Sequence, residues 1–223
     1  MNIYQRKGER SRENIILQAS DVLNTYGSSI TLDEIAKYTE ISKSKITNHF
    51  STKENLFIAI TELYIKDIQN YFDSITFSNH FTWKEYISIL SDIMDLQFKY
   101  RSAIMFIWTA SFKYEAFMNE LNESFKIRKK SMIALFEKLI EEFYLSPAVM
   151  EEKNFKIFYH QHAVLGVHWI NTYLVFDYAQ NYYDVKPTYL AGTTAIYKPY
   201  LTEKGLREFE ALNLEKYLKE LRK

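Results

Sequence analysis

A short polar stretch, residues 43–49, groups side chains of the kinds that contact DNA. It offers two ammonium groups, two hydroxyls, an amide and an imidazole, from Lys43, Ser44, Lys45, Thr47, Asn48 and His49. Such groups donate hydrogen bonds to phosphate oxygens, and Lys and Asn can also read guanine and adenine edges in the major groove. The stretch therefore indicates a DNA-binding surface. The alternative is that its lysines only form a solvated helix face.

Two short helical patterns are expected to position these side chains. The first places Leu32, Ile35 and Ala36 on one apolar face. It opens at Thr31, and Glu34 three residues later completes a capping box.

The second pattern opens at Ser42 and turns only Ile46 and Phe50 inward. Ile41 lies in the break between the two patterns and is expected to pin the turn. Two short helices joined by a tight turn form a helix-turn-helix, whose second helix enters the major groove.

The order of these features resembles the N-terminal domain of the TetR family of transcriptional repressors. A helix from Glu13 to Tyr26 precedes them, and another follows, opened by a capping box of Ser51 and Glu54. The segments that carry the resemblance are Glu13–Ser20, Leu23, Tyr26-Gly27, Thr31, Ile35-Ala36, Ile41–Lys43, Ile46, His49-Phe50 and Ser51–Leu56. Two positions depart from the family pattern.

Glu40 stands in the turn, where the family usually has glycine. A non-glycine residue can adopt the left-handed backbone there at a modest cost. Thr47 stands where the family often has an aromatic residue, so a phosphate-contacting tyrosine is absent at that position.

The resemblance implies a dimeric transcriptional repressor that a small-molecule effector releases from a palindromic operator. Residues 1–53 would form the DNA-binding domain, and residues 54–223 a helical effector-binding and dimerisation domain. The DNA-binding residues expected on this basis are Thr31, Lys43, Ser44, Lys45, Thr47, Asn48, His49 and Lys53. Of these, His49 and Lys53 are expected to hold the phosphate backbone.

The scarcity of glycine and proline predicts an all-α fold. The chain has 5 glycines and 3 prolines, and none of them lies between Gly27 and Pro147. β-Strands are usually joined by turns that contain glycine or proline, and this interval has neither residue. After the helix-turn-helix, helices are expected at 51–71, 82–98, 101–112, 114–144, 151–178, 188–200 and 208–221, the last as one helix or two short ones. A mobile arm at 1–9, with Arg6 and Lys7 available to phosphates, a loop at 74–81 and a turn at 185–187 complete the prediction.

The high aromatic content, with 18 Tyr, 16 Phe and 3 Trp, allows two interpretations. Large side chains can leave a pocket between helices for an apolar or aromatic effector, or they can simply fill the core. Because the C-terminal domains of this family usually bind an effector, a pocket is expected. Its candidate lining is Arg101, Met105, Trp108, Phe112, Phe136, Tyr159, His162 and Trp169. Arg101 could bind an anionic head group or form a surface salt bridge.

Two late segments, 153–178 and 188–201, are expected to pair with their two-fold mates in a homodimer. Both carry apolar and aromatic residues on more than one face, which exceeds the need of one monomer core. Aromatic-rich, Lys-poor stretches are typical of dimer interfaces.

Composition and motifs argue against other classes. There is no cysteine, which excludes disulfides and suits a reducing cytoplasm, and no apolar run is long enough to span a membrane. The 5 histidines lack the spacing of a metal site, and no catalytic motif occurs. We expect no cofactor, no metal and no enzymatic activity. The charge is balanced at 28 basic and 28 acidic residues, although residues 1–53 hold 8 basic against 6 acidic.

Two rival interpretations remain open. One is a DNA-binding protein of the same fold that has no small-molecule effector and acts architecturally or through a protein partner. The other is an unrelated all-helical enzyme or lipid carrier in which the helix-turn-helix pattern is accidental.

Overall fold

The computed structural model describes residues 3–110 and 115–221, with the side chains of 8–107, 119 and 121–221. Regular structure in these residues is helical, which confirms the all-α prediction; a single antiparallel bridge joins Leu145 and Leu201. Among them, no helix combines the length and apolar character needed to cross a membrane. Contacts divide the chain into two compact units, Met1–Ser74 with Asp95–Phe125 and Ile75–Met94 with Lys126–Lys223. The functional boundary expected after residue 53 stays a prediction.

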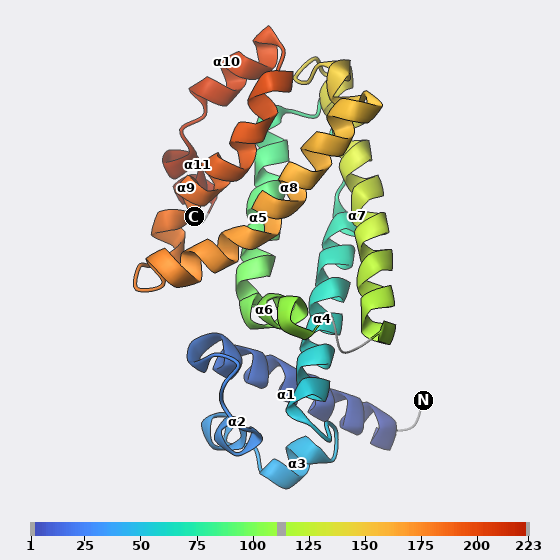
Figure 1. Ribbon diagram of the computed structural model, residues 1–223, viewed down its shortest axis with the longest axis vertical. Coiled ribbons are helices and arrows are strands. Elements are labelled where there is room, and N and C mark those ends of the chain that lie inside the picture. The colour runs from blue at the N-terminus through green and yellow to red at the C-terminus, as the bar shows by residue number, and fades with distance from the viewer. Residues whose placement is uncertain (1–2, 111–114, 222–223) are drawn as a thin grey trace. The chain divides into compact units, whose positions relative to one another are not determined.

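The first unit contains the expected DNA-binding domain, which is called the head below (Figure 1). Its helices are α1 (Ile3–Tyr26), α2 (Leu32–Thr39), α3 (Lys43–Thr47), α4 (Lys53–Ser74) and α6 (Arg101–Ala110). The expectation of a mobile arm at 1–9 was wrong, because α1 already begins at Ile3. Residues between Ile3 and Glu13 are mostly good helix formers, and the single Gly8 is not enough to stop a helix. The side chains of Arg6 and Lys7 lie outside the described residues.

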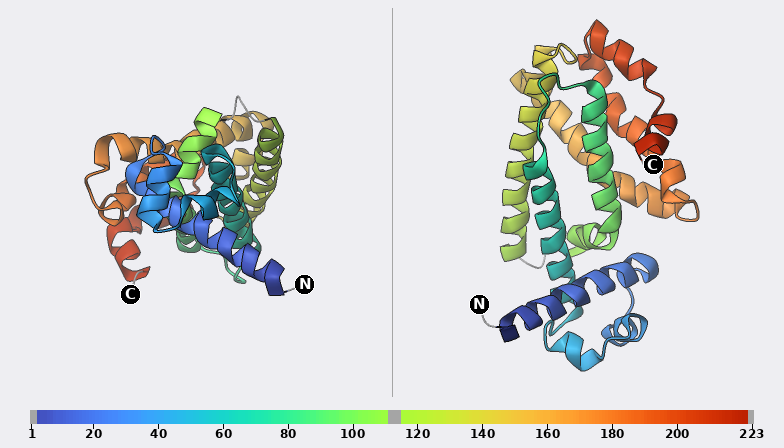
Figure 2. Two further views of the ribbon diagram at one scale, coloured as in Figure 1. Left: turned by 90° about the horizontal axis from the view of Figure 1, so that it is seen from below. Right: turned by 180° about the vertical axis from the view of Figure 1, so that it is seen from behind.

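Within the first unit, α6 packs against both α1 and α4 (Figures 1 and 2). Phe57 of α4 stacks on Phe106 of α6 with ring centroids 4.6 Å apart. Asn24, near the end of α1, binds both sides of the junction that precedes α6. Its Nδ2 donates to the Lys99 carbonyl at 2.7 Å, and its Oδ1 accepts from the Ser102 amide at 3.0 Å. One side chain therefore fastens the head to α6.

The second unit holds the rest of the helices. They are the first part of α5 (Trp83–Lys99), most of α7 (Glu115–Glu141), η1 (Pro147–Met150), α8 (Glu152–Thr172), the π-helix η2 (Tyr173–Asp177), α9 (Tyr182–Thr194), η3 (Ala195–Tyr200), α10 (Glu203–Ala211) and α11 (Leu214–Leu221). The chain thus ends in two short helices, the second of the two expected forms.

The turn expected at 185–187 was wrong, because Pro187 lies inside α9. Asn181 caps the helix by accepting a hydrogen bond from the Tyr183 amide at 2.9 Å, so the helix begins only five residues before the proline. Near the start of a helix a proline removes few backbone hydrogen bonds, and here its ring is also buried.

An aromatic cluster forms the core of the second unit. Phe136 of α7, Phe158 of α8 and Tyr197 of η3 contact one another edge to face, with centroids 4.8–5.7 Å apart. Tyr86 of α5 shares a hydrogen bond with Tyr197, and burial raises the pKa of both phenols. Edge-to-face pairs of this kind add to the stability gained from burial alone.

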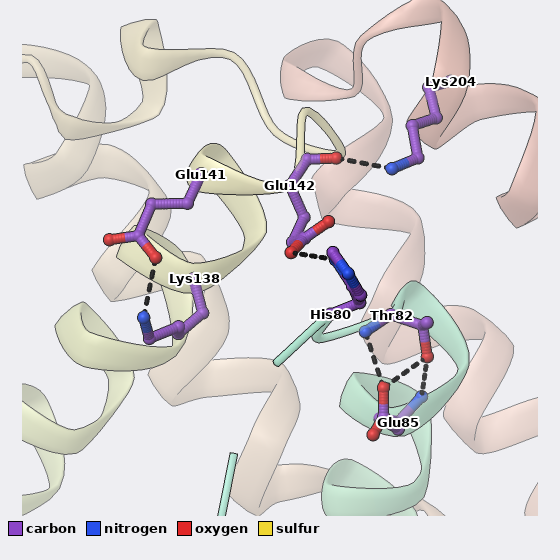
Figure 3. Close-up of polar contacts among 7 residues, drawn as sticks. All are labelled: His80, Thr82, Glu85, Lys138, Glu141, Glu142 and Lys204. Carbon is purple, nitrogen blue, oxygen red and sulfur yellow. Dashed lines mark hydrogen bonds and ion pairs between the residues drawn. The ribbon is translucent and has the colours of Figure 1, made fainter. Parts of the chain in front are cut away.

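The end of α7 is joined to α10 by side chains that bind its last carbonyls (Figure 3). Lys204 Nζ donates to the Glu142 carbonyl at 2.7 Å, and Thr202 Oγ1 donates to the Phe143 carbonyl. The Glu142 carboxylate also lies 3.4 Å from His80 Nδ1. Near the same loop, Glu85 and Thr82 form the capping box expected at the start of α5. The bonds from Lys204 and Thr202 satisfy carbonyls that the end of a helix leaves free.

Gly205 is required where α10 meets this helix end. A Cβ atom at residue 205 would lie 2.1 Å from the Tyr144 carbonyl oxygen, a backbone atom that cannot move aside cheaply. We expect Gly205→Ala to lower the free energy of unfolding by about 1–3 kcal/mol, measured by urea denaturation. Gly8→Ala is the matched control, because Gly8 is helical and no atom lies within 4 Å of the position that a Cβ would take there. It should raise stability slightly; equal effects of the two substitutions would contradict the close approach.

Candidate nucleic-acid interface

The start of α2 is fixed by the capping box that the sequence predicts. Thr31 Oγ1 accepts from the Glu34 amide at 3.2 Å, and the Thr31 amide donates to Glu34 Oε2 at 2.7 Å. The backbone bond from Thr31 lowers the pKa of the Glu34 carboxyl, because it stabilises the charged form. Thr31 therefore has a structural role; its expected DNA contact stays a prediction.

The turn between α2 and α3 has the left-handed residue that the sequence indicated. Glu40 has φ 55° and ψ 22°, and its amide donates to the Lys37 carbonyl at 3.4 Å. A left-handed non-glycine residue costs about 1–2 kcal/mol. Ile41, the next residue, is buried and pins the turn as expected.

Helix α3 has one inward face and several outward polar groups. Ile46 is fully buried, and Ser42 caps the helix by accepting from the Lys45 amide at 3.4 Å. Phe50 is buried directly after the helix. With so little of α3 turned inward, its remaining side chains face solvent.

The outward group contains four exposed residues, Lys43, Ser44, Lys45 and Asn48. Thr47 and His49 are half-buried: Thr47 Oγ1 donates to the Ser44 carbonyl at 3.2 Å, and the His49 ring packs beside Phe50. Four of the six residues of the polar stretch that the sequence singled out lie on α3, and Asn48 and His49 lie in the turn directly after it.

Lys53 lies apart from this group. Its Nζ donates to the Ser28 and Ile30 carbonyls at 2.8 and 2.9 Å, so it ties the start of α4 to the loop before α2. The cap of α4 is Thr52, whose Oγ1 accepts from the Asn55 amide at 3.1 Å. The capping box expected at Ser51 and Glu54 was therefore wrong by one residue.

The residues proposed to line an effector pocket divide between the two units. In the first unit, Arg101 Nη2 donates to the Asn24 carbonyl at 3.1 Å and Nη1 to the Phe98 carbonyl at 3.0 Å. Met105 is half-buried on the same helix. The side chain of Trp108 and the whole of Phe112 lie outside the described residues.

The other four candidates lie in the second unit, most of them in two aromatic groups. Phe136 and His162 belong to the core cluster, and desolvation lowers the pKa of His162 to about 4. Trp169 instead packs on Tyr182 and Tyr189.

Tyr159 lies under the ammonium of Lys129, which is 5.2 Å from its ring centre. Among the described residues, no three histidine, cysteine or carboxylate side chains gather where a metal ion could be held.

Sequence reasoning missed two residues that shape the head. Asp33, in the first turn of α2, forms an ion pair with Lys43, with 2.8 Å between Oδ2 and Nζ. An acidic residue in the first turn is already explained by its favourable interaction with the helix N-terminus. The sequence therefore did not indicate that Asp33 pairs with a lysine ten residues away. Asn24 is the second, and its partners lie more than 70 residues further along the chain.

Solved structures share this fold over nearly the whole chain. A TetR-family transcriptional regulator from Marinobacter aquaeolei VT8 superposes with a TM-score of 0.79 at 20% identity, covering 92% of this chain and 98% of its own. CprB, a TetR-family protein from S. coelicolor A3(2), gives 0.65 at 16% identity, with 96% and 98% covered. RolR in complex with resorcinol gives 0.51 at 15% identity, with 94% and 97% covered.

Helices α1–α4 define a DNA-binding protein of the helix-turn-helix class. Residues 15–60 match the family described as bacterial regulatory proteins, tetR family. The family match is therefore carried by the N-terminal part of the chain, and the solved structures show that the fold extends over nearly the whole chain. No curated protein sequence matches it.

The two lysines Lys53 and Lys45 should respond differently to loss of charge. Lys53→Met removes two hydrogen bonds inside the head and should lower the free energy of unfolding by about 1–2 kcal/mol. Lys45→Met, on the exposed face of α3, should change it by less than about 0.5 kcal/mol. Thermal and urea unfolding of both variants measure the difference. An unchanged stability of the Lys53 variant would mean that its two bonds contribute nothing.

Proposed function

We propose that this regulator is a dimeric repressor whose two copies of α3 enter successive major grooves of a palindromic operator. The observation that carries the proposal is the set of exposed polar side chains on α3 and directly after it, Ser44, Lys45 and Asn48. Lys43 is also exposed on α3, but its ammonium is paired with Asp33. Lys45 and Asn48 would meet base edges and phosphates, since both are exposed and Lys and Asn suit guanine and adenine. Thr31 and Lys53, which are engaged in the head, would act mainly by holding α2 and α4 in place. The proposed role is not catalytic.

The proposed dimer surface is formed by α8, η2 and α9. Its exposed apolar side chains are Ile157, Val164, Leu165, Val175 and Phe176, and Phe176 is 77% exposed. On α9 the exposed positions Ala191 and Gly192 are small, which would let a second helix approach closely. Large apolar side chains in water favour a partner, and two copies of this surface would form an isologous interface.

Control by a small molecule would act through the α1–α6 contact. Asn24 and Arg101 fasten α1 to the junction before α6 by bonds to backbone groups. A ligand that shifted α6 would therefore also shift α1 and the attached α2 and α3. Ligand and operator would then antagonise each other to the same extent. RolR, crystallised with resorcinol, supports a small aromatic compound as the class of effector.

A second candidate is the same DNA-binding protein without an effector. It is favoured by the dispersal of the proposed lining, since Trp169 and Phe136 lie in separate aromatic groups. Titration with small phenols, followed by operator affinity, distinguishes the two candidates. A fall in affinity supports the effector, and binding without any fall supports the second candidate.

Operator binding tests the proposed contacts of α3. A duplex selected from a random pool serves as the operator. Each phosphate contact contributes a slope of about −0.9 to the plot of log affinity against log salt concentration. We expect Lys45→Ala to weaken binding and to flatten this slope by about 0.9 for each head engaged. Lys216→Ala, an exposed lysine of α11, is the control and should leave the slope unchanged. Equal slopes for Lys45→Ala and the unsubstituted protein would overturn the assignment.

A charge introduced into the apolar surface tests the proposed dimer. Phe176→Glu should convert the protein to a monomer in sedimentation equilibrium, because a buried unpaired carboxylate is costly. Phe143→Glu is the matched control, since Phe143 is 73% exposed but lies just after α7, outside α8, η2 and α9. A dimer that persists in Phe176→Glu, or one that is lost in Phe143→Glu, would contradict the proposed interface.

A further inference from the structure

The helix-turn-helix of this chain has no excess of positive charge. Between residues 32 and 49 it carries three lysines, Lys37, Lys43 and Lys45, and three carboxylates, Asp33, Glu34 and Glu40. Binding to a phosphate backbone depends on cations that replace condensed counterions. The position of each carboxylate relative to the lysines therefore decides how many cations remain for DNA.

Within the described residues 32–49, two of the three carboxylates form no ion pair with the lysines of α3. Glu34 accepts hydrogen bonds from the amide and hydroxyl of Thr31 within its own capping box. Glu40 occupies the left-handed position of the turn and is exposed.

Asp33 differs, because its carboxylate reaches across from α2 to α3. Its Oδ2 accepts a hydrogen bond from Lys43 Nζ at 2.8 Å, and the two side chains are 69% and 52% exposed. Asp33 lies in the first turn of α2, where the helix end favours a negative charge. Lys43 in turn lies in the first turn of α3 and is exposed, as are Ser44 and Asn48. The pair therefore includes a residue of the helix that is proposed to bind DNA.

We propose that Asp33 limits the affinity of α3 for DNA of any sequence by neutralising Lys43. This inference rests on the proposed DNA-binding role of α3. Binding to arbitrary DNA is almost entirely electrostatic, whereas binding to an operator adds hydrogen bonds to base edges. A lysine already paired with a carboxylate releases no counterion when DNA arrives. The loss reduces affinity for all duplexes by about the same factor, because a phosphate contact carries no sequence information.

The salt dependence of binding gives the pair a signature of its own. The probe is a duplex of mixed sequence that lacks the selected operator site, and the variants are Asp33→Asn, Lys43→Ala and the double variant. In the protein with Asp33, Lys43→Ala should leave the slope of log affinity against log salt unchanged. Asp33→Asn should tighten binding and steepen the slope by about 0.9 for each head engaged, and adding Lys43→Ala should remove that gain.

Lys45→Ala is the matched control, since this exposed lysine lies two residues from Lys43. It should flatten the slope equally with and without Asp33. Asp33→Ser provides a second way to remove the charge, and thermal unfolding of each variant checks that the head stays folded.

If Lys43→Ala flattens the slope equally in both backgrounds, Lys43 leaves Asp33 when DNA binds and this inference is overturned, while the proposed function stands. If Asp33→Asn tightens binding to the selected operator but not to the mixed duplex, Asp33 acts on base recognition and the inference is also overturned. Absence of DNA binding by the unsubstituted protein would overturn both the inference and the proposed function.

Discussion

Burial of Ile46 is the interaction on which the proposed DNA-binding surface depends. Helix α3 has only five residues, far fewer than a helix needs to be stable alone in water. Its shape must therefore come from packing, and Ile46 is its one buried residue. Ile41 before it and Phe50 after it are buried as well, so the helix is held at its middle and at both ends. A single inward residue leaves the rest of α3 free to face a ligand.

Helix ends explain where several charged side chains of this protein are engaged. The last carbonyls of a helix have no partner within the helix, and nearby cations can satisfy them. Arg101 donates to the carbonyl of Asn24 near the end of α1 and to that of Phe98 near the end of α5. Lys204 does the same for Glu142 just beyond α7. Arg101 thus joins α6 to α1, and Lys204 joins α10 to the end of α7, through bonds between residues 77 and 62 positions apart in the sequence.

Features that depend on neighbouring residues could be predicted from the sequence. The capping boxes at Thr31 and Thr82 and the inward position of Ile46 follow from short-range patterns. The left-handed backbone at Glu40 was expected from the family resemblance, because the family usually has glycine there. The helical fold followed from the scarcity of glycine and proline. The exposure of the polar side chains of α3 could also be predicted, because a short helix with one apolar residue turns that residue toward the core and the others toward solvent.

Features that depend on tertiary packing could not be predicted. Lys53 is a long cation near a helix start, and its sequence context does not reveal that the Ser28 and Ile30 carbonyls lie within reach. Pro187 reads as a turn, but the cap at Asn181 and burial of the ring keep it helical. The proposed pocket residues were chosen by residue type, and side-chain type does not determine which aromatic groups pack together.

Amide chemical shifts of the isotope-labelled protein on addition of its selected duplex would test the central claim most directly. We predict that the largest changes fall on residues 43–49 and on the first turn of α2, while the amides of α10 and α11 stay unchanged. Shifts confined to the second unit, or an α3 whose amides do not respond to saturating duplex, would contradict the proposed role of α3.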